Sequence, residues 1–240
     1  DRAGALTFQG GRVFGPNATT AQDLEPEYIS FSPDSKYAYV TLQENNAIAT
    51  FDFATKKFTK IALLGTISQT VDASDRDGSS LGKRIDSNDV VMGLPMPDTM
   101  VSFTKNGTLF LVTANEGDAR PDDGDILRGA ALITANLTAS NATTAINNGL
   151  ARLNLLKNVG DANGDGLIDQ PTMMGTRSFT VWNALTGNRT YDSSSTIENY
   201  VANNNPFTFN MNSGNMSDWD TRSDDKGPEP EALAYGSVAG

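Results

Sequence analysis

The sequence contains no cysteine and no histidine among its 240 residues. Disulfide bonds, thiolate catalysis, zinc–histidine sites and Ser-His-Asp triads are therefore excluded within this chain. No apolar run approaches the length needed to cross a bilayer, so we expect no transmembrane segment. Any catalysis would have to rely on carboxylates, Lys, Arg, Tyr, Ser or a hard metal ion.

Positive charge is also scarce. The 18 Lys and Arg residues stand against 29 Asp and Glu residues, which gives a net charge of −11. Nucleic-acid binding needs clusters of basic side chains to neutralise phosphates, so we expect no nucleic-acid partner. An acidic chain suits cation binding and a calcium-rich exterior. With 38% hydrophobic residues the chain is globular rather than disordered.

One stretch of the sequence recurs and organises the chain. Its first copy, residues 25–46, has a Pro-flanked acid, two apolar runs joined by a turn, and a closing Glu44. The same plan returns in residues 96–118 and begins again at residues 229–231. Residues 28–64 contain four short strand-like runs at near-regular spacing, which is the size of one β-propeller blade.

The sequence therefore predicts an all-β fold, with residues 1–240 forming a single partial β-propeller of four-stranded antiparallel blades. Because the spacing of the repeats is too long for bare blades, we also expect long loop insertions. A closed propeller needs at least four blades, so about half of it should be absent from this chain. The repeats start near residues 25, 96, 150 and 229, and the insertions cover residues 65–95, 117–149 and 193–227.

The sharpest motif is the segment 161–169, which reads DANGDGLID. It places oxygen ligands at the spacing of an EF-hand-type calcium loop, with Gly166 at the sharp turn. The twelfth position is Thr172 rather than a bidentate Glu, so we expect a calcium loop without flanking helices. An Asp/Asn/Gly turn that binds nothing is the alternative. The expected Ca²⁺ ligands are Asp161, Asn163, Asp165, Leu167 and Asp169.

Acidic residues at the ends of the repeats form a second candidate metal site. In a propeller the innermost strand of a blade starts on the face where the second strand finishes, so these carboxylates should share one face. Converging carboxylates repel one another unless a cation lies between them. Turn chemistry around the strands explains the same residues equally well. The members of this second site are Glu27, Glu44, Asp98, Glu116 and Glu231.

A segment of mixed charge, residues 218–226, precedes the third repeat start and could hold a phosphate or a calcium ion. A solvated loop with weak ion pairs is the alternative for this segment. Arg177 and Trp182 are interpreted as a strand-edge and a core residue, without catalytic roles. If the protein is instead an enzyme, the catalytic candidates are Glu27, Glu231, Arg222 and Lys226.

Six N-glycosylation sequons favour secretion. Their number is only modestly above chance for this composition. Their placement says more, because Asn106 and Asn188 lie in expected hairpin turns, where a glycan can be accommodated. The sequon asparagines are Asn17, Asn106, Asn136, Asn141, Asn188 and Asn215.

Five segments together resemble the choice-of-anchor I family. The resemblance implies a secreted or surface-anchored protein with a seven-bladed propeller of about twice this length, of which this chain is the N-terminal half. Some animal members are called mesenchyme-specific cell surface glycoproteins, and some bacterial members are labelled alkaline phosphatase-like or phytase-like. The segments are residues 23–52, DASDRDG at 72–78, LVTANEGDAR at 111–120, DANGDGLID with GTRSFTVW within 161–182, and SDDKGPEPEALAYG at 223–236.

We therefore expect a secreted, calcium-binding β-propeller glycoprotein that acts as a structural or adhesive component of the cell surface, the matrix or an extracellular filament. Ca²⁺ is the expected cofactor. Its partners should be proteins or glycans at the surface, together with the missing C-terminal half of its own propeller. The alternative is a calcium-dependent phosphoesterase that uses carboxylates on the propeller face to hold metals and basic side chains to clamp phosphate.

Overall fold

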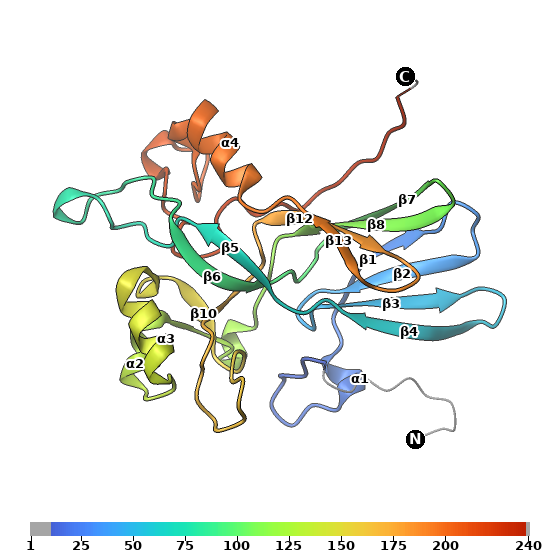
Figure 1. Ribbon diagram of the computed structural model, residues 1–240, viewed down its shortest axis with the longest axis horizontal. Coiled ribbons are helices and arrows are strands. Elements are labelled where there is room, and N and C mark those ends of the chain that lie inside the picture. The colour runs from blue at the N-terminus through green and yellow to red at the C-terminus, as the bar shows by residue number, and fades with distance from the viewer. Residues whose placement is uncertain (1–10, 239–240) are drawn as a thin grey trace.

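The computed structural model describes residues 11–238 and consists mainly of β-sheet with short helices (Figure 1). The predicted all-β class is confirmed. No helix within the described residues is long and apolar enough to cross a membrane. The short helical turns outside the sheets are α1 (Thr20–Asp23), η1 (Ser79–Leu81), η2 (Pro121–Asp123), η4 (Pro206–Thr208) and η5 (Met216–Asp218).

The first four-stranded sheet, called here the first meander, has the strand order β1-β2-β3-β4 and is antiparallel throughout. Its strands follow one another along the chain, as residues 28–64 predict. The Ser32 hydroxyl closes the first turn by accepting the N–H groups of Lys36 and Tyr37 at 3.1 and 3.0 Å. The strands are β1 (Pro26–Phe31), β2 (Tyr37–Leu42), β3 (Ala47–Asp52) and β4 (Lys57–Leu63).

The second four-stranded sheet, the second meander, combines strands from two distant parts of the chain in the order β13-β12-β8-β7. Ser178 of β12 pairs with Asn115 of β8, so the segment 116–177 leaves and re-enters at one end of this sheet. β12 and β13 are the strands predicted for a blade starting near residue 150. They instead complete the sheet that starts with β7, because β8 and β12 pair across the whole insertion. The strands are β7 (Met100–Lys105), β8 (Thr108–Asn115), β12 (Ser178–Asn183) and β13 (Arg189–Asp192).

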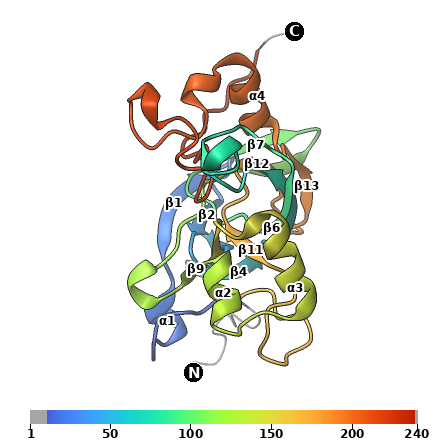
Figure 2. The ribbon, with the colours of Figure 1, turned by 90° about the vertical axis from the view of Figure 1, so that its left-hand side faces the viewer.

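The predicted loop insertions 65–95 and 117–149 contain regular structure and pack together around a second core, which includes Val91, Leu132, Ile146 and Leu155. α2 and α3 lie beside β6 and β11 on the side that faces the viewer in Figure 2. The three-stranded sheet β11-β6-β5 and the pair β10-β9 belong to this region. The elements are β5 (Ile67–Val71), β6 (Asp89–Leu94), β9 (Ile126–Arg128), α2 (Gly129–Thr134), α3 (Ser140–Ala145), η3 (Ile146–Leu150), β10 (Asn154–Leu156) and β11 (Thr172–Met174).

A hydrophobic core joins the two meanders. Tyr39 and Ile48 of the first meander meet Met100, Leu111 and Trp182 of the second. Trp182 is 2% exposed, and its indole N–H donates a hydrogen bond of 2.9 Å to the Thr113 hydroxyl. The core role predicted for Trp182 is therefore confirmed.

Arg177 is a buried residue rather than the strand-edge residue that the sequence suggests, because it is 1% exposed. Its guanidinium donates to the carbonyl oxygens of Asp72, Ser223 and Asp225 at 2.7, 2.8 and 3.0 Å. It also forms an ion pair of 2.7 Å with Glu198, which belongs to α4 (Thr196–Asn204). Arg177 therefore ties the end of β5, α4 and the C-terminal segment to the start of β12.

Removal of Glu198 should be strongly destabilising. The change Glu198→Ala leaves the Arg177 guanidinium buried without its carboxylate, and we expect a loss of about 3–5 kcal/mol in the free energy of unfolding. Chemical denaturation at neutral pH measures it. Lys36→Ala, which removes an exposed ion pair with Asp34, is the control and should have little effect. Equal effects of the two changes would contradict the structural role of the buried pair.

Candidate functional site

The segment 161–169 forms an exposed loop on the surface of the second core. Both carboxylate oxygens of Asp161 accept backbone N–H groups, from Gly164 at 2.7 Å and from Gly166 at 2.9 Å. These hydrogen bonds hold the pKa of Asp161 below its usual value. Gly164 and Gly166 have φ angles of +80° and +87°, which glycine adopts without strain. The loop is therefore a tight turn built around its first carboxylate.

The other polar side chains of this loop also bond to its backbone. Asn163 accepts the N–H of Asp165 at 2.9 Å, and Asp165 accepts the N–H of Leu167 at 2.8 Å. Asp169 reaches back and accepts the N–H of Ala162 at 3.0 Å. All the side-chain and backbone atoms of this loop that could bind a metal ion are oxygens. Calcium in proteins is bound by oxygen ligands. The five expected ligand residues thus share one compact loop, although no ligand comes from its twelfth position.

Ile168 fixes the loop to the body of the protein. Its side chain is 3% exposed and belongs to the second core. Its N–H donates to the Leu137 carbonyl at 2.8 Å, and its own carbonyl accepts the N–H of Ala139 at 2.9 Å. The Asn141 side chain adds a hydrogen bond of 3.0 Å to the Asp169 carbonyl. An ion in this loop would therefore brace the connection between α2 and α3.

A second acidic site lies where the end of β8 meets the C-terminal segment. Oxygens of Glu116, Glu229 and Glu231 lie within 4.8 Å of one another, and no other three acidic side chains of residues 11–238 are so close. Burial, together with the charges of Glu116, Glu27 and Glu231, raises the pKa of Asp98. The structure thus brings together Glu27, Asp98, Glu116 and Glu231 as expected. It adds Glu229, whose signal in the sequence is its place at the third repeat start.

Basic and amide side chains already contact this acidic face. The Lys226 ammonium donates to Glu116 at 2.6 Å, and the Gln43 amide donates to the other oxygen of the same carboxylate at 3.0 Å. Arg222 pairs with Glu229 and, at 3.2 Å, with Asp225. Arg222 and Lys226 are the residues expected to clamp phosphate in the enzymatic alternative. A phosphate would have to compete with these carboxylates for both cations.

Glu44 lies apart from the other acidic residues of the predicted second site. Gln43 points its side chain toward Glu116, and Glu44, the next residue, lies beside Glu25 and Asp118 instead. Burial raises the pKa of Glu44 to about 7, and the charges of Glu25 and Asp118 add to the effect. Gln43 and Glu44 lie in the turn between β2 and β3, which the Asn46 N–H closes by donating to the Gln43 carbonyl at 2.8 Å, and their side chains leave this turn in different directions.

Two acidic motifs that lie far apart in the sequence meet in the interior. Asp72 and Asp220 are both fully buried, at 0% exposure. Asp72 accepts the N–H of Asp86 at 2.6 Å, and Asp220 accepts the Ser223 hydroxyl at 2.7 Å. Burial raises the pKa of Asp72 to about 8 and that of Asp220 to about 7, and the nearby charge of Asp77 contributes to both shifts. The sequence gives no signal that these two carboxylates lie near each other in the interior.

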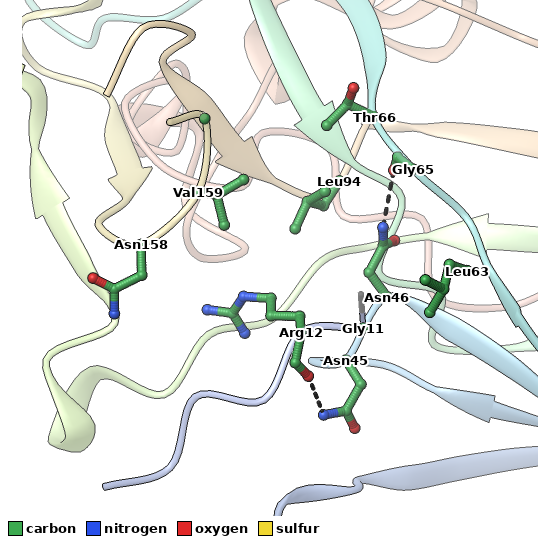
Figure 3. A pocket seen from close by; sticks show the side chains of 11 residues that line it. Gly11, Arg12, Asn45, Asn46, Leu63, Gly65, Thr66, Leu94, Asn158 and Val159 are labelled. Atoms are coloured by element: carbon green, nitrogen blue, oxygen red, sulfur yellow. Dashed lines mark hydrogen bonds between the residues drawn. The ribbon is translucent and has the colours of Figure 1, made fainter. Parts of the chain in front are cut away.

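A pocket of about 410 Å³ lies between the N-terminal segment, the β2–β3 turn and the insertion (Figure 3). The Asn45 side chain donates to the Arg12 carbonyl, and the Asn46 side chain donates to the Gly65 carbonyl, each at 2.9 Å. The Arg12 guanidinium is paired with Asp125. The Asn45 and Asn46 amides and the paired nitrogen of Arg12 thus help to hold the fold together.

The raised pKa values of Asp72 and Asp220 predict a pH dependence of stability. The folded state keeps protons that the unfolded state releases above its carboxyl pKa of about 4. This contribution is therefore complete below that value and is lost as pH rises through about 7–8. We expect the melting temperature to fall between pH 6 and pH 9 in chelator, by about 2–4 °C for each kcal/mol lost.

The double change Asp72→Asn/Asp220→Asn should make this fall smaller, with the contribution of Glu44 remaining, whereas Asp122→Asn/Asp123→Asn, at two exposed positions of η2, should not change it. Thermal melts at matched ionic strength measure the three slopes. Identical slopes in all three proteins would show that the two buried carboxyl groups do not titrate as described.

The comparison with known proteins identifies the family. The family model described as the choice-of-anchor I domain matches residues 1–240. No curated protein and no solved structure matches this chain. The match covers the motifs at residues 23–52, 161–169 and 223–236, and it confirms the resemblance that they indicate. The chain belongs to the choice-of-anchor I domain family.

Proposed function

We propose that this domain is a secreted, calcium-binding β-propeller glycoprotein module that serves as a structural or adhesive component of the cell surface, the matrix or an extracellular filament. The loop 161–169 carries the proposal, because its backbone is already folded around Asp161 and its donors are all oxygens. Extracellular modules bind calcium with dissociation constants on the order of 0.1–1 mM, which millimolar calcium fills. Since Ile168 anchors the loop to the second core, the ion acts as a structural clip.

The propeller is the architectural part of the proposal. The two meanders pack against each other through Tyr39 and Trp182, as neighbouring propeller blades do. The opposite face of the first meander is apolar, and its Ile29, Phe31 and Phe58 side chains are 54%, 56% and 51% exposed. Wide exposed apolar faces mark interaction surfaces. In our proposal a further blade from the C-terminal half of a seven-bladed propeller covers this face.

The glycosylation sites support the extracellular part of the proposal. An asparagine must be exposed to carry a glycan, and all six sequon asparagines are exposed in the structure. Asn17, Asn106 and Asn136 also have positive φ angles of 61°, 51° and 56°. These three residues lie in turns rather than within strands.

The acidic face is the second candidate cation site within this proposal. It combines Glu27, Asp98, Glu116, Glu229 and Glu231, and its charge is partly neutralised by Arg222 and Lys226. We therefore expect calcium to fill the loop 161–169 before it binds here. The phosphoesterase alternative has less support, because both of its proposed phosphate clamps are paired with carboxylates.

Calcium should stabilise the protein through the loop. At ten times the dissociation constant, binding adds about 1.4 kcal/mol. For a domain of this size that corresponds to a rise of about 3–6 °C in the melting temperature relative to chelator. Asp161→Asn/Asp165→Asn should abolish the rise, because it removes two charged ligands of the same loop. Thermal melts with calcium, with magnesium and with chelator measure the effect.

The control for this experiment is Asp122→Asn/Asp123→Asn, which removes the same charge from exposed positions of the same segment, 116–177. This variant should respond to calcium as the unaltered protein does. A melting temperature that is the same in calcium and in chelator would refute the calcium clip. A calcium response that survives in Asp161→Asn/Asp165→Asn would place the ion elsewhere, and Glu116→Gln/Glu231→Gln then tests the acidic face.

The enzymatic alternative makes a separate prediction. We expect the purified protein to show no hydrolysis of a generic phosphomonoester above background at saturating calcium. Calcium-dependent turnover that is lost in Glu27→Gln or Glu231→Gln would overturn the structural role and establish the alternative. Lys57→Gln, at an exposed site on β4, is a control for the effect of a surface substitution on the assay.

A further inference from the structure

A pocket of about 500 Å³ opens between the two meanders, at the end where the β7–β8 turn lies. One wall comes from β2, β3 and β4, and the other comes from the start of β8 and the end of β12. The volume lies in the range of pockets that bind small ligands, about 300–1,000 Å³. The calcium loop and the acidic face contribute no residue to it.

Tyr39 brings an unused polar group into this pocket. Its side chain is 3% exposed and lines the pocket. A tyrosine hydroxyl can both donate and accept a hydrogen bond, so it can pair with a ligand hydroxyl. The Tyr39 hydroxyl makes no hydrogen bond within the range 11–238 and is not among the fully buried polar atoms there, so it faces the open pocket. Burial raises the pKa of Tyr39 to about 12, and the neighbouring Tyr37 and Asp34 add to the shift, so the hydroxyl stays a proton donor.

Lys60 brings an uncompensated positive charge to the same pocket. Its ammonium donates a hydrogen bond of 2.7 Å to the Leu185 carbonyl across the gap between the meanders. No ion pair links Lys60 to a carboxylate within the described part of the chain. Burial lowers the pKa of Lys60, and no acidic neighbour offsets this effect. Because an ammonium has three donors, Lys60 can serve an incoming anion as well.

The remaining lining is neutral and partly aromatic. No Asp or Glu lines the pocket, although the chain carries a net charge of −11. Tyr37 is 37% exposed, and its ring lies 6.5 Å from that of Tyr39, centroid to centroid. An exposed tyrosine ring can cover the apolar face of a sugar. Hydroxyl groups of Thr59 and Thr108 complete the polar lining.

We propose that this pocket binds a saccharide that carries a carboxylate, such as a hexuronate residue. The carboxylate accepts hydrogen bonds from Lys60, the sugar hydroxyls pair with the Tyr39 hydroxyl, and the sugar ring lies against Tyr37. The free acid and the end of a glycan chain share this chemistry. The inference deepens the proposed function by naming a ligand, and it rests on that function only for the extracellular setting in which acidic glycans occur.

Calorimetric titration with sodium glucuronate, with a glucuronate-containing oligosaccharide and with glucose tests the site. We expect both uronates to bind and glucose to bind at least 10-fold more weakly, since it lacks the charge-assisted hydrogen bond. Lys60→Met should weaken uronate binding about 10–100-fold, and Tyr39→Phe should weaken it about 2–10-fold. Lys57→Met, which removes an exposed lysine of the same strand, is the matched control and should bind normally.

The melting temperature of Tyr39→Phe shows whether the Tyr39 hydroxyl binds the ligand or stabilises the fold. Because the Tyr39 hydroxyl has no partner in the described residues, Tyr39→Phe should leave the melting temperature of the ligand-free protein unchanged or raise it. A clear fall would assign the hydroxyl a structural role and overturn the proposal. Equal binding of glucose and glucuronate, normal uronate binding by Lys60→Met, or no binding of any probe would also overturn it.

The oligosaccharide and monosaccharide arms distinguish the source of the ligand. Tighter binding of the oligosaccharide indicates the end of a glycan chain, and equal binding indicates the free acid. The titration is repeated in chelator with Asp161→Asn/Asp165→Asn, where uronate binding should persist because the pocket contains no calcium ligand. The calcium clip and the saccharide site can therefore fail independently.

Discussion

The buried guanidinium of Arg177 sets the arrangement of the C-terminal part of the chain. A charge at 1% exposure needs partners in the interior, because its desolvation is otherwise too costly. Arg177 finds them in Glu198 and in the carbonyls of Ser223 and Asp225. The next turn of the chain passes so close that a Cβ atom on Gly227 would lie 2.7 Å from the Arg177 side chain. This contact carries the chain to Glu229 and so assembles the acidic face.

Features with a local cause could be predicted from the sequence. The first meander consists of consecutive hairpins, so alternation and turn residues predict its strands. All expected ligands of the loop 161–169 lie within nine residues, and their spacing is visible without a fold. The sequence also predicts the strands β12 and β13, but it does not predict which strand pairs with them. Their alternation does not reveal that β8 lies beside them across the insertion.

Sites assembled from distant segments could not be predicted in this way. Asp72 and Asp220 belong to two polar segments that lie far apart in the sequence, and only the packing of the folded chain buries both of them. The pocket around Tyr39 and Lys60 is lined by residues of both meanders. Its shape therefore depends on how the two sheets pack together, which the sequence of either sheet alone does not predict. The positions of the repeated acidic residues were only partly predictable, because the turn after β2 directs Gln43, and not Glu44, toward Glu116.

The pairing of Asn115 with Ser178 also imposes an order on folding during synthesis. The strands of the first meander are neighbours in the chain, so this sheet can form soon after residue 63 has left the ribosome. The second meander, which contains the hairpin of β7 and β8, can be completed only after residue 192 has left the ribosome. Closing so long a loop is entropically unfavourable and slow. The second core contains Leu132, Ile146 and Leu155 of the intervening segment, so packing of this core shortens the loop that has to be closed.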